Sequence, residues 1–122
     1  MRNHTRAHRR SHRRGILAEH MALIWLMLKG YWPVAMRYKT PVGEVDLIMR
    51  RGNILTFVEV KGRRHILDAA QAIHTKNQTR VVRASQHFLM AHPSYANFQV
   101  RFDALLIAWY ARPQHVVNAF GG

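Results

Sequence analysis

The chain has 122 residues, of which 48% are hydrophobic, enough for one domain with its own core. It carries 19 Lys and Arg against 6 Asp and Glu, a net charge of +13, so a polyanion is the expected partner. Nucleic acid is the first expectation and an anionic membrane surface the second, and charge alone does not separate them. There is no Cys, which excludes disulfides and thiolate metal sites and fits a reducing compartment.

The first residues differ from the rest in composition. Residues 1–14 contain six Arg and three His and no acid, so we expect a disordered basic arm followed by a single domain over 15–122. The arm and the apolar run 21–28 together imitate a signal peptide, but Glu19 interrupts them and the run is too short for a membrane span. We therefore expect a cytoplasmic protein that does not enter a membrane.

Two segments show helical spacing. Residues 16–29 place Leu17, Met21, Ile24 and Leu28 on one stripe, which predicts a largely buried helix that stops at Gly30. A longer helix is expected over 69–91. Asp68 and Gln71 resemble a capping box at its start, and Lys76, Arg80 and Arg83 form a basic ridge along it.

The remaining segments read as strands. We expect them at residues 33–39, 43–49, 53–61 and 98–110, with a final strand or tail at 114–120. The "RRGN" stretch at 50–53 predicts a hairpin turn, and the apolar run 98–110 predicts a central strand. The order α-β-β-β-α-β-β predicts an α/β fold with a mixed central sheet flanked by helices.

The hairpin strands carry three of the six acids. Alternation puts Glu44, Asp46 and Ile48 on one face of their strand, and Phe57, Glu59 and Lys61 on one face of the next. If the strands pair through the turn at 50–53, Asp46 and Glu59 converge at one end of the sheet, with Lys61 just beyond.

Such a trio has a known chemical use. Two carboxylates can hold a divalent ion of the Mg²⁺ type, and a nearby Lys can stabilise the charge that develops on a phosphate. A Glu-x-Lys pair on a strand is by itself more often a surface ion pair. Here "LTFVEVK" is otherwise apolar on both faces, so the acid lies at the end of a buried strand, where an acid without a role is costly.

These motifs resemble a known family. "GEVDLI" followed by "FVEVKGRR" is similar to the YraN-like family of small bacterial proteins, which are themselves predicted nucleases. Further matches are "LAEHMA", "QAIHTKNQTR", "RFDALLI" and "NAF", so the resemblance covers residues 15 to 120. The family in turn resembles the restriction-endonuclease-like superfamily, with Asp and Glu-x-Lys on adjacent strands, and archaeal Holliday-junction resolvases.

The resemblance implies roles for individual residues. Asp46, Glu59 and Glu19 would be ligands of Mg²⁺ or Mn²⁺, with the main-chain carbonyl of Val60 as a further ligand, and Lys61 would be the catalytic lysine. The superfamily places Pro before the Asp, whereas Val45 stands there in this sequence. YraN-like proteins also have an aliphatic residue at that position, so this departure separates a subfamily.

Other charged residues have two readings each. Glu44 is either a second ligand or an ion-pair partner of a turn Arg, and Gln71 either touches the site or only caps its helix. A phosphate-backbone contact is expected for Arg63, Arg64, Lys76 and Arg80, with a solvated helix face as the alternative for the last two. Asp103 shares a strand face with Arg101, which predicts an internal ion pair.

The expected function is Mg²⁺- or Mn²⁺-dependent hydrolysis of phosphodiester bonds in branched or otherwise structured DNA. The first alternative is a non-catalytic nucleic-acid-binding module, and the second a ribosome-associated RNA-binding protein with steep salt dependence. The acid cluster argues against the second, because a pure polyanion binder gains nothing from grouped acids. Junction cleavage would favour a two-fold homodimer, since two symmetric cuts need two sites.

Overall fold

The computed structural model describes residues 16–63, 75–108 and 111–120, without the side chains of 63 and 75–77. The predicted basic arm over 1–14 and the predicted capping box of Asp68 and Gln71 lie outside the described residues.

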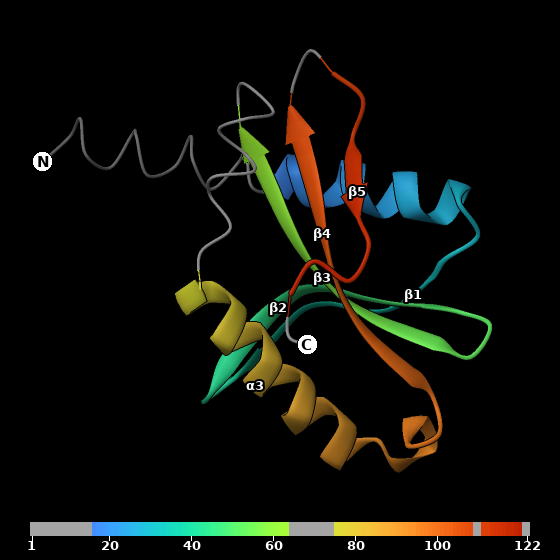
Figure 1. Ribbon diagram of the computed structural model, residues 1–122, viewed down its shortest axis with the longest axis vertical. Coiled ribbons are helices and arrows are strands. Elements are labelled where there is room, and N and C mark those ends of the chain that lie inside the picture. Colours follow the sequence, from blue (N-terminus) through green and yellow to red (C-terminus); the bar gives the residue numbers. More distant parts are fainter. Residues whose placement is uncertain (1–15, 64–74, 109–110, 121–122) are drawn as a thin grey trace, which may run out of the picture.

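A five-stranded mixed sheet forms the centre of the fold, in the order β1-β2-β3-β4-β5 (Figure 1). The strands are β1 (Trp32–Thr40), β2 (Gly43–Arg51), β3 (Ile54–Arg63), β4 (Gln99–Ala108) and β5 (Gln114–Val116). All neighbours are antiparallel except β3 and β4, which run parallel. With the helix over residues 16–28 and α3 (Thr75–Ala91), the predicted order α-β-β-β-α-β-β and the mixed sheet are confirmed, and this arrangement is consistent with a restriction-endonuclease-like core.

The two parallel strands are the buried centre of the sheet. A parallel pair needs a long crossover connection, and α3 lies in the segment that joins β3 to β4, before the short 3-10 helix η1 (Pro93–Tyr95). Residues of both strands are fully buried, among them Leu55, Val58, Leu105 and Ile107. This agrees with the central strand predicted from the apolar run.

The helices cover opposite faces of the sheet (Figure 1). On one face, the 16–28 helix packs Ala18, Ala22 and Leu26 against a core that includes Leu47 and Val58. On the other face, α3 contributes three buried residues to a second core. These are Val81, Ala84 and Phe88. The sheet is therefore buried on both sides, as its apolar central strands require.

The predicted buried stripe of the first helix was wrong at three of its four residues, and only Met21 packs against the core. Leu17, Ile24 and Leu28 are 53%, 59% and 79% exposed, whereas Ala18 and Ala22 are buried. The helix is apolar around most of its circumference, so its sequence does not distinguish one stripe from the next. The small Ala side chains let the helix approach the sheet closely. Among the described helices, none is both long and apolar enough to span a membrane.

Candidate active site

The site lies where β2 and β3 separate. In the described sheet, β2 pairs with β3 from Leu47 opposite Val58 to Arg51 opposite Ile54, which leaves residues 52–53 as the hairpin turn. Asp46 directly precedes Leu47, where the pairing begins. Its side-chain carboxylate, and not a main-chain carbonyl of β2, is the hydrogen-bond acceptor for β3 at this point. Its Oδ2 accepts a hydrogen bond from the backbone N–H of Val60 at 2.8 Å. The side chain is thereby fixed in the gap between the two strands.

The regular face alternation predicted for this strand is interrupted at the same place. Val45 and Ile48 both pack in the core beneath α3, although an ideal strand would put them on opposite faces. Ile48 does lie on the α3 side with Glu44 and Asp46, as predicted, but Leu47 packs in the opposite core, so Val45 and Leu47 do not share a face. Across the sheet, Arg37 of β1 has a φ of 50°, so the backbone irregularity extends to the neighbouring strand.

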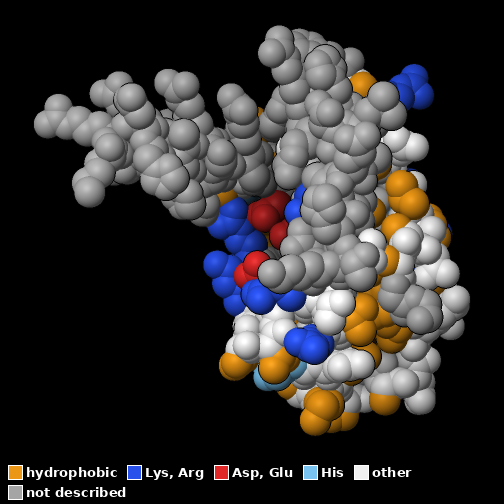
Figure 2. Space-filling view, turned by 60° about the vertical axis from the view of Figure 1, so that its left-hand side comes forward, with side chains coloured by type: hydrophobic (Ala, Val, Ile, Leu, Met, Phe, Trp, Pro, Cys, Tyr) orange, Lys and Arg blue, Asp and Glu red, His pale blue; other side chains and the backbone are white. Residues whose placement is uncertain are grey.

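The acids and the lysine meet in one cleft. Its lining residues come from β2, β3 and α3: Glu44, Asp46, Glu59, Lys61, Arg80 and Val81. Asp46, Glu59 and Lys61 are the three residues that the predicted hairpin pairing brings together. Figure 2 shows acidic side chains in a hollow of this surface, with Lys and Arg side chains around it.

The Glu59 side chain is the most deeply buried of the cleft's charged groups, with 4% of it exposed. The Lys61 side chain is 20% exposed, and its Nζ lies 3.4 Å from Glu59 Oε1. Both residues belong to β3 and point to the α3 side of the sheet with Phe57, as alternation predicted. The ammonium group thus partly compensates a carboxylate that the sheet has removed from water.

A glycine allows α3 to close one side of the cleft. A Cβ atom on Gly43 would lie 1.9 Å from the main-chain oxygen of Arg80, so only Gly permits this close approach of β2 and α3. The contact brings Arg80 and Val81 to the cleft. Thr40 fixes the preceding turn, because its Oγ1 donates to the Gly43 carbonyl at 2.8 Å and accepts from the Gly43 N–H at 3.0 Å. The sequence alone placed Gly43 only at the start of a strand and did not indicate this contact.

The site holds excess negative charge. Burial raises the pKa of Asp46 from its ordinary 3.8 to about 6, and the hydrogen bond from Val60 opposes that rise. The nearby charges of Glu19 and Glu59 raise the Asp46 pKa further, whereas Lys61 lowers it. Asp46 is therefore costly to ionise in the folded protein, and a bound cation would relieve that cost.

Glu19 lies near this group but is engaged elsewhere. Its Oε2 accepts from Arg37 Nε at 2.6 Å, and its side chain is 14% exposed. The Glu19 charge acts on Asp46, although Glu19 is absent from the residues that line the cleft. The structure thus puts the predicted helix acid beside the site, in an ion pair with an arginine that sequence reasoning did not single out.

Comparison with known sequences identifies the family. The model of the uncharacterised protein family UPF0102 matches residues 18–107. The chain belongs to this family. It is 50% identical over 108 residues to a UPF0102 protein of Bradyrhizobium diazoefficiens, covering 88% of this chain and 81% of the relative. A Rhodopseudomonas palustris relative is 51% identical over 108 residues (88% and 80% covered), and one from Nitrobacter winogradskyi is 48% identical over 106 (87% and 90%).

The structure describes only some of the other residues of this UPF0102 protein that were predicted to contact metal or nucleic acid. Arg80 lines the cleft, and so does Glu44, whose side chain is exposed. Several predicted residues lie outside the described residues or have side chains that are not described. They are Arg63, Arg64, Gln71 and Lys76. The nucleic-acid contacts predicted for the basic residues, Arg80 included, stay predictions.

The donor set of the UPF0102 cleft fits a hard divalent cation. Asp46 and Glu59 offer carboxylate oxygens, the ligands that Mg²⁺ prefers. Across residues 16–63, 75–108 and 111–120, no group of three His, Cys, Asp or Glu could hold a metal ion by itself. A cation here would complete its coordination with main-chain oxygen and water, which Mg²⁺ commonly retains.

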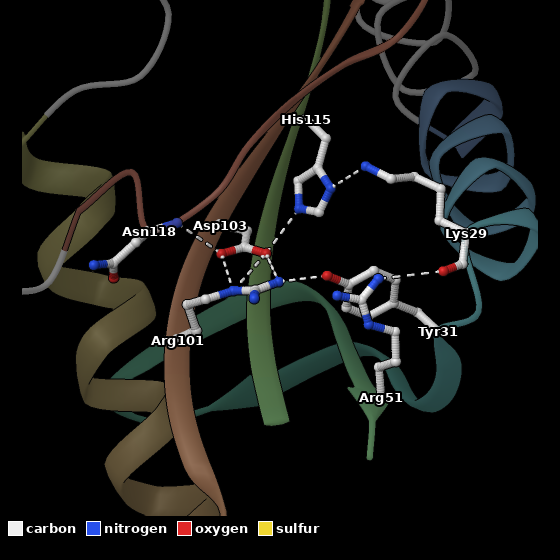
Figure 3. A network of polar contacts seen from close by, with 7 residues as sticks. All are labelled: Lys29, Tyr31, Arg51, Arg101, Asp103, His115 and Asn118. Atoms are coloured by element: carbon white, nitrogen blue, oxygen red, sulfur yellow. Dashed lines mark hydrogen bonds and ion pairs between the residues drawn. The ribbon is translucent and has the colours of Figure 1, made fainter. Parts of the chain in front are cut away.

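A second polar cluster is built around Asp103, which is fully buried (Figure 3). Arg101 holds its carboxylate with two nitrogens, at 2.9 Å from Nε to Oδ1 and 2.8 Å from Nη2 to Oδ2. His115 Nε2 lies 2.7 Å from Oδ2, and the backbone N–H of Asn118 donates to Oδ1 at 2.9 Å. The predicted internal ion pair between Arg101 and Asp103 is thus present.

This cluster connects segments that are distant in the sequence. Arg101 Nη2 also donates to the Tyr31 hydroxyl at 2.6 Å, and Lys29 Nζ lies 2.7 Å from His115 Nδ1 (Figure 3). Burial alone would raise the pKa of Asp103, but the hydrogen bonds from His115, Arg101 and Asn118 hold it well below its ordinary value. Sequence reasoning missed His115, since its partner lies on another strand and no local spacing indicates it. The cluster fixes β5 and the end of the first helix to β4.

Proposed function

We propose that this UPF0102 protein is a metal-dependent endonuclease that hydrolyses phosphodiester bonds of DNA, with branched or otherwise structured DNA as substrate. The observation that carries the proposal is the convergence of Asp46, Glu59 and Lys61 in one cleft, at the point where β2 and β3 separate. An architectural ion pair would need only Glu59 and Lys61. The hydrogen bond from Val60 needs only a neutral acceptor such as an Asn amide oxygen, so the charge of the third group, the partly buried Asp46, is not explained by the fold.

In this proposal, Asp46 and Glu59 would hold Mg²⁺ or Mn²⁺ together with the main-chain carbonyl of Val60, and Glu19 would become a further ligand only on leaving its ion pair with Arg37. The ion supplies Lewis acidity and lowers the pKa of bound water. Lys61 lies at the open side of Glu59 and is partly exposed, so its ammonium group can face a phosphate that enters the cleft. Arg80, on the opposite wall, is suited to bind a neighbouring phosphate of the same strand.

The preference for DNA of unusual structure has two supports. The net charge of +13 favours a polyanion without reading its sequence. Shape is then the remaining basis of selection. The resemblance to Holliday-junction resolvases agrees with this, and a two-fold dimer would supply the two sites that symmetric cutting requires.

The test is a cleavage assay on single-stranded, duplex, flap and four-way-junction DNA with Mg²⁺, Mn²⁺ or EDTA. Asp46→Asn and Lys61→Ala are run beside wild type. Arg83→Gln is the control, because Arg83 is an exposed residue of α3 outside the cleft. We expect cutting that needs the metal, is lost in both cleft variants and persists in the control. DNA binding without cutting on any substrate would instead favour the non-catalytic binding module.

A further inference from the structure

Arg37 is an unusual residue for its place in the sheet. Its φ of 50° lies in the left-handed region, which strand residues other than Gly rarely adopt. Only one other described non-Gly residue, Asn118, has a positive φ, and Asn tolerates that conformation better. Such backbone conformations cluster at functional sites, where the surrounding structure holds them in place.

Arg37 also lies opposite the central acid of the cleft. The β1–β2 pairing runs from Met36 opposite Leu47 to Tyr38 opposite Val45, so Arg37 falls opposite Asp46. Arg37 does not line the cleft itself, but its guanidinium contacts Glu19, whose charge acts on Asp46.

The arginine is masked by a single acid. Among the described residues, Glu19 is the one ion-pair partner of the Arg37 guanidinium, through Nε at 2.6 Å. The Arg37 side chain is 38% exposed and that of Glu19 only 14%, so the arginine is the partner that solvent and ligands can reach. A guanidinium binds phosphate oxygens in the same forked geometry in which it binds a carboxylate.

We propose that Glu19 and Arg37 form an exchangeable pair, in which Arg37 is a phosphate-binding residue beside the cleft whose guanidinium is occupied by Glu19 in the free protein. When a DNA phosphate takes the place of the carboxylate on Arg37, Glu19 is released toward the cation that Asp46 and Glu59 hold. This inference rests on the proposed function and adds a residue and a coupling to it. DNA and cation then strengthen each other's binding, and the coupling is reciprocal.

A fixed surface ion pair would behave differently. Its removal would change stability slightly and leave the cation site as it was. General electrostatics would also raise cation affinity when any nearby positive charge is removed. The test therefore needs another arginine near the carboxylates as reference, and Arg80 supplies it because it lines the cleft and makes no ion pair to Glu19 among the described contacts.

The experiment is a double-substitution cycle read by Mn²⁺ binding to the DNA-free protein, followed by electron paramagnetic resonance or calorimetry. Arg37→Gln should raise Mn²⁺ affinity about tenfold, because Glu19 is freed. The gain should vanish in the Glu19→Gln background. Arg80→Gln should give the same smaller gain in both backgrounds. Arg37→Lys, which keeps the charge and the mask, should stay near wild type and guards against misfolding of the Gln variant.

The complementary arm measures binding of a four-way DNA junction in EDTA. Glu19→Gln should strengthen binding several-fold because Arg37 is unmasked, and this gain should disappear in the double variant. Mn²⁺ affinity that does not rise in Arg37→Gln, or a rise that persists without Glu19, would overturn the exchange. If the exchange is overturned but wild type still cleaves DNA in a metal-dependent way, the proposed function is retained. A wild-type protein that binds no Mn²⁺ would reject both.

Discussion

The Asp46 carboxylate accepts the Val60 N–H at 2.8 Å, at the first position where β2 no longer pairs with β3. One oxygen of the side chain thus completes the hydrogen bonding of a strand that has lost its neighbour. The same bond fixes the orientation of the carboxylate toward Glu59 and Lys61. The separation of the strands and the placement of the acid are therefore one structural feature, and a change at Asp46 affects both stability and chemistry.

Replacing Asp46 by Asn should stabilise the metal-free protein. The amide oxygen can still accept from Val60, whereas the poorly solvated charge is gone. The folded-state pKa of about 6 lies above the ordinary 3.8, so raising the pH through this window lowers wild-type stability by up to about 3 kcal/mol. Asp46→Asn should be more stable than wild type in urea unfolding at pH 7.5 with EDTA. The difference in free energy of unfolding between the variant and wild type should shrink toward pH 4. Equal stability of the two proteins at pH 7.5 would contradict the prediction.

Divalent cations should stabilise wild type and not Asp46→Asn. When a ligand binds only the folded state and its free concentration is ten times its Kd, it raises the free energy of unfolding by about 1.4 kcal/mol. Thermal unfolding with and without Mn²⁺ measures this. Glu44→Gln is the informative companion, because Glu44 lines the cleft but is exposed at the outer end of β2. We expect this variant to keep the Mn²⁺ effect. If Mn²⁺ no longer stabilises the Glu44→Gln variant, Glu44 is itself a ligand of the ion.

The sequence predicted much of this arrangement, since hairpin pairing and side-chain alternation are local rules. The turn predicted at 50–53, which the structure narrows to 52–53, and the shared face of Glu59 and Lys61 follow from residues close in the chain. Contacts between distant segments were not predictable in the same way. The packing of Gly43 on α3 depends on two backbones meeting, and no pattern of side chains indicates it.

The first helix illustrates a further limit. Its apolar residues surround most of the helix, so the choice of buried face depends on the shape of the sheet beneath it. The buried face consists of Ala18, Ala22 and Leu26, whereas Leu17 and Leu28 lie on the exposed side. The ion pair between Glu19 and Arg37 follows from this rotation of the helix and was equally hidden.

Replacing Gly43 by Ala should disrupt the cleft from its α3 side. The added Cβ would lie 1.9 Å from the Arg80 main-chain oxygen, so α3 must shift away from β2. Overpacking of this kind costs about 1–3 kcal/mol, and Arg80 moves with the helix. We expect lower stability in urea together with weaker DNA binding per folded molecule.

Gly52→Ala is the matched control for this change. Gly52 has a φ of +60°, so Ala is strained there, but nothing lies within 4 Å of the added Cβ. This variant should lose about 1 kcal/mol of stability and keep wild-type DNA affinity. Equal loss of DNA affinity in both glycine variants would show that the packing of α3 on Gly43 has no special part in the cleft.

Replacing Asp103 by Asn should release the C-terminal segment. Arg101, whose side chain is only 12% exposed, would lose its buried counter-ion, which costs about 3–5 kcal/mol. The Asp103 pKa is lowered in the fold, so its contribution is present above the ordinary Asp range and is lost as the pH falls below it. The stability gap between wild type and variant should therefore narrow on acidification.

Hydrogen exchange locates the effect of Asp103→Asn. The Asn118 amide, which donates to Asp103, and the amides of β5 should exchange faster, whereas those of the β2–β3 hairpin should change little at a pH where the variant stays folded. Arg112→Gln, an exposed change just before β5, is the control and should leave exchange unaltered. Uniformly faster exchange across the sheet would mean that Asp103 supports the whole fold and does not specifically fasten β5.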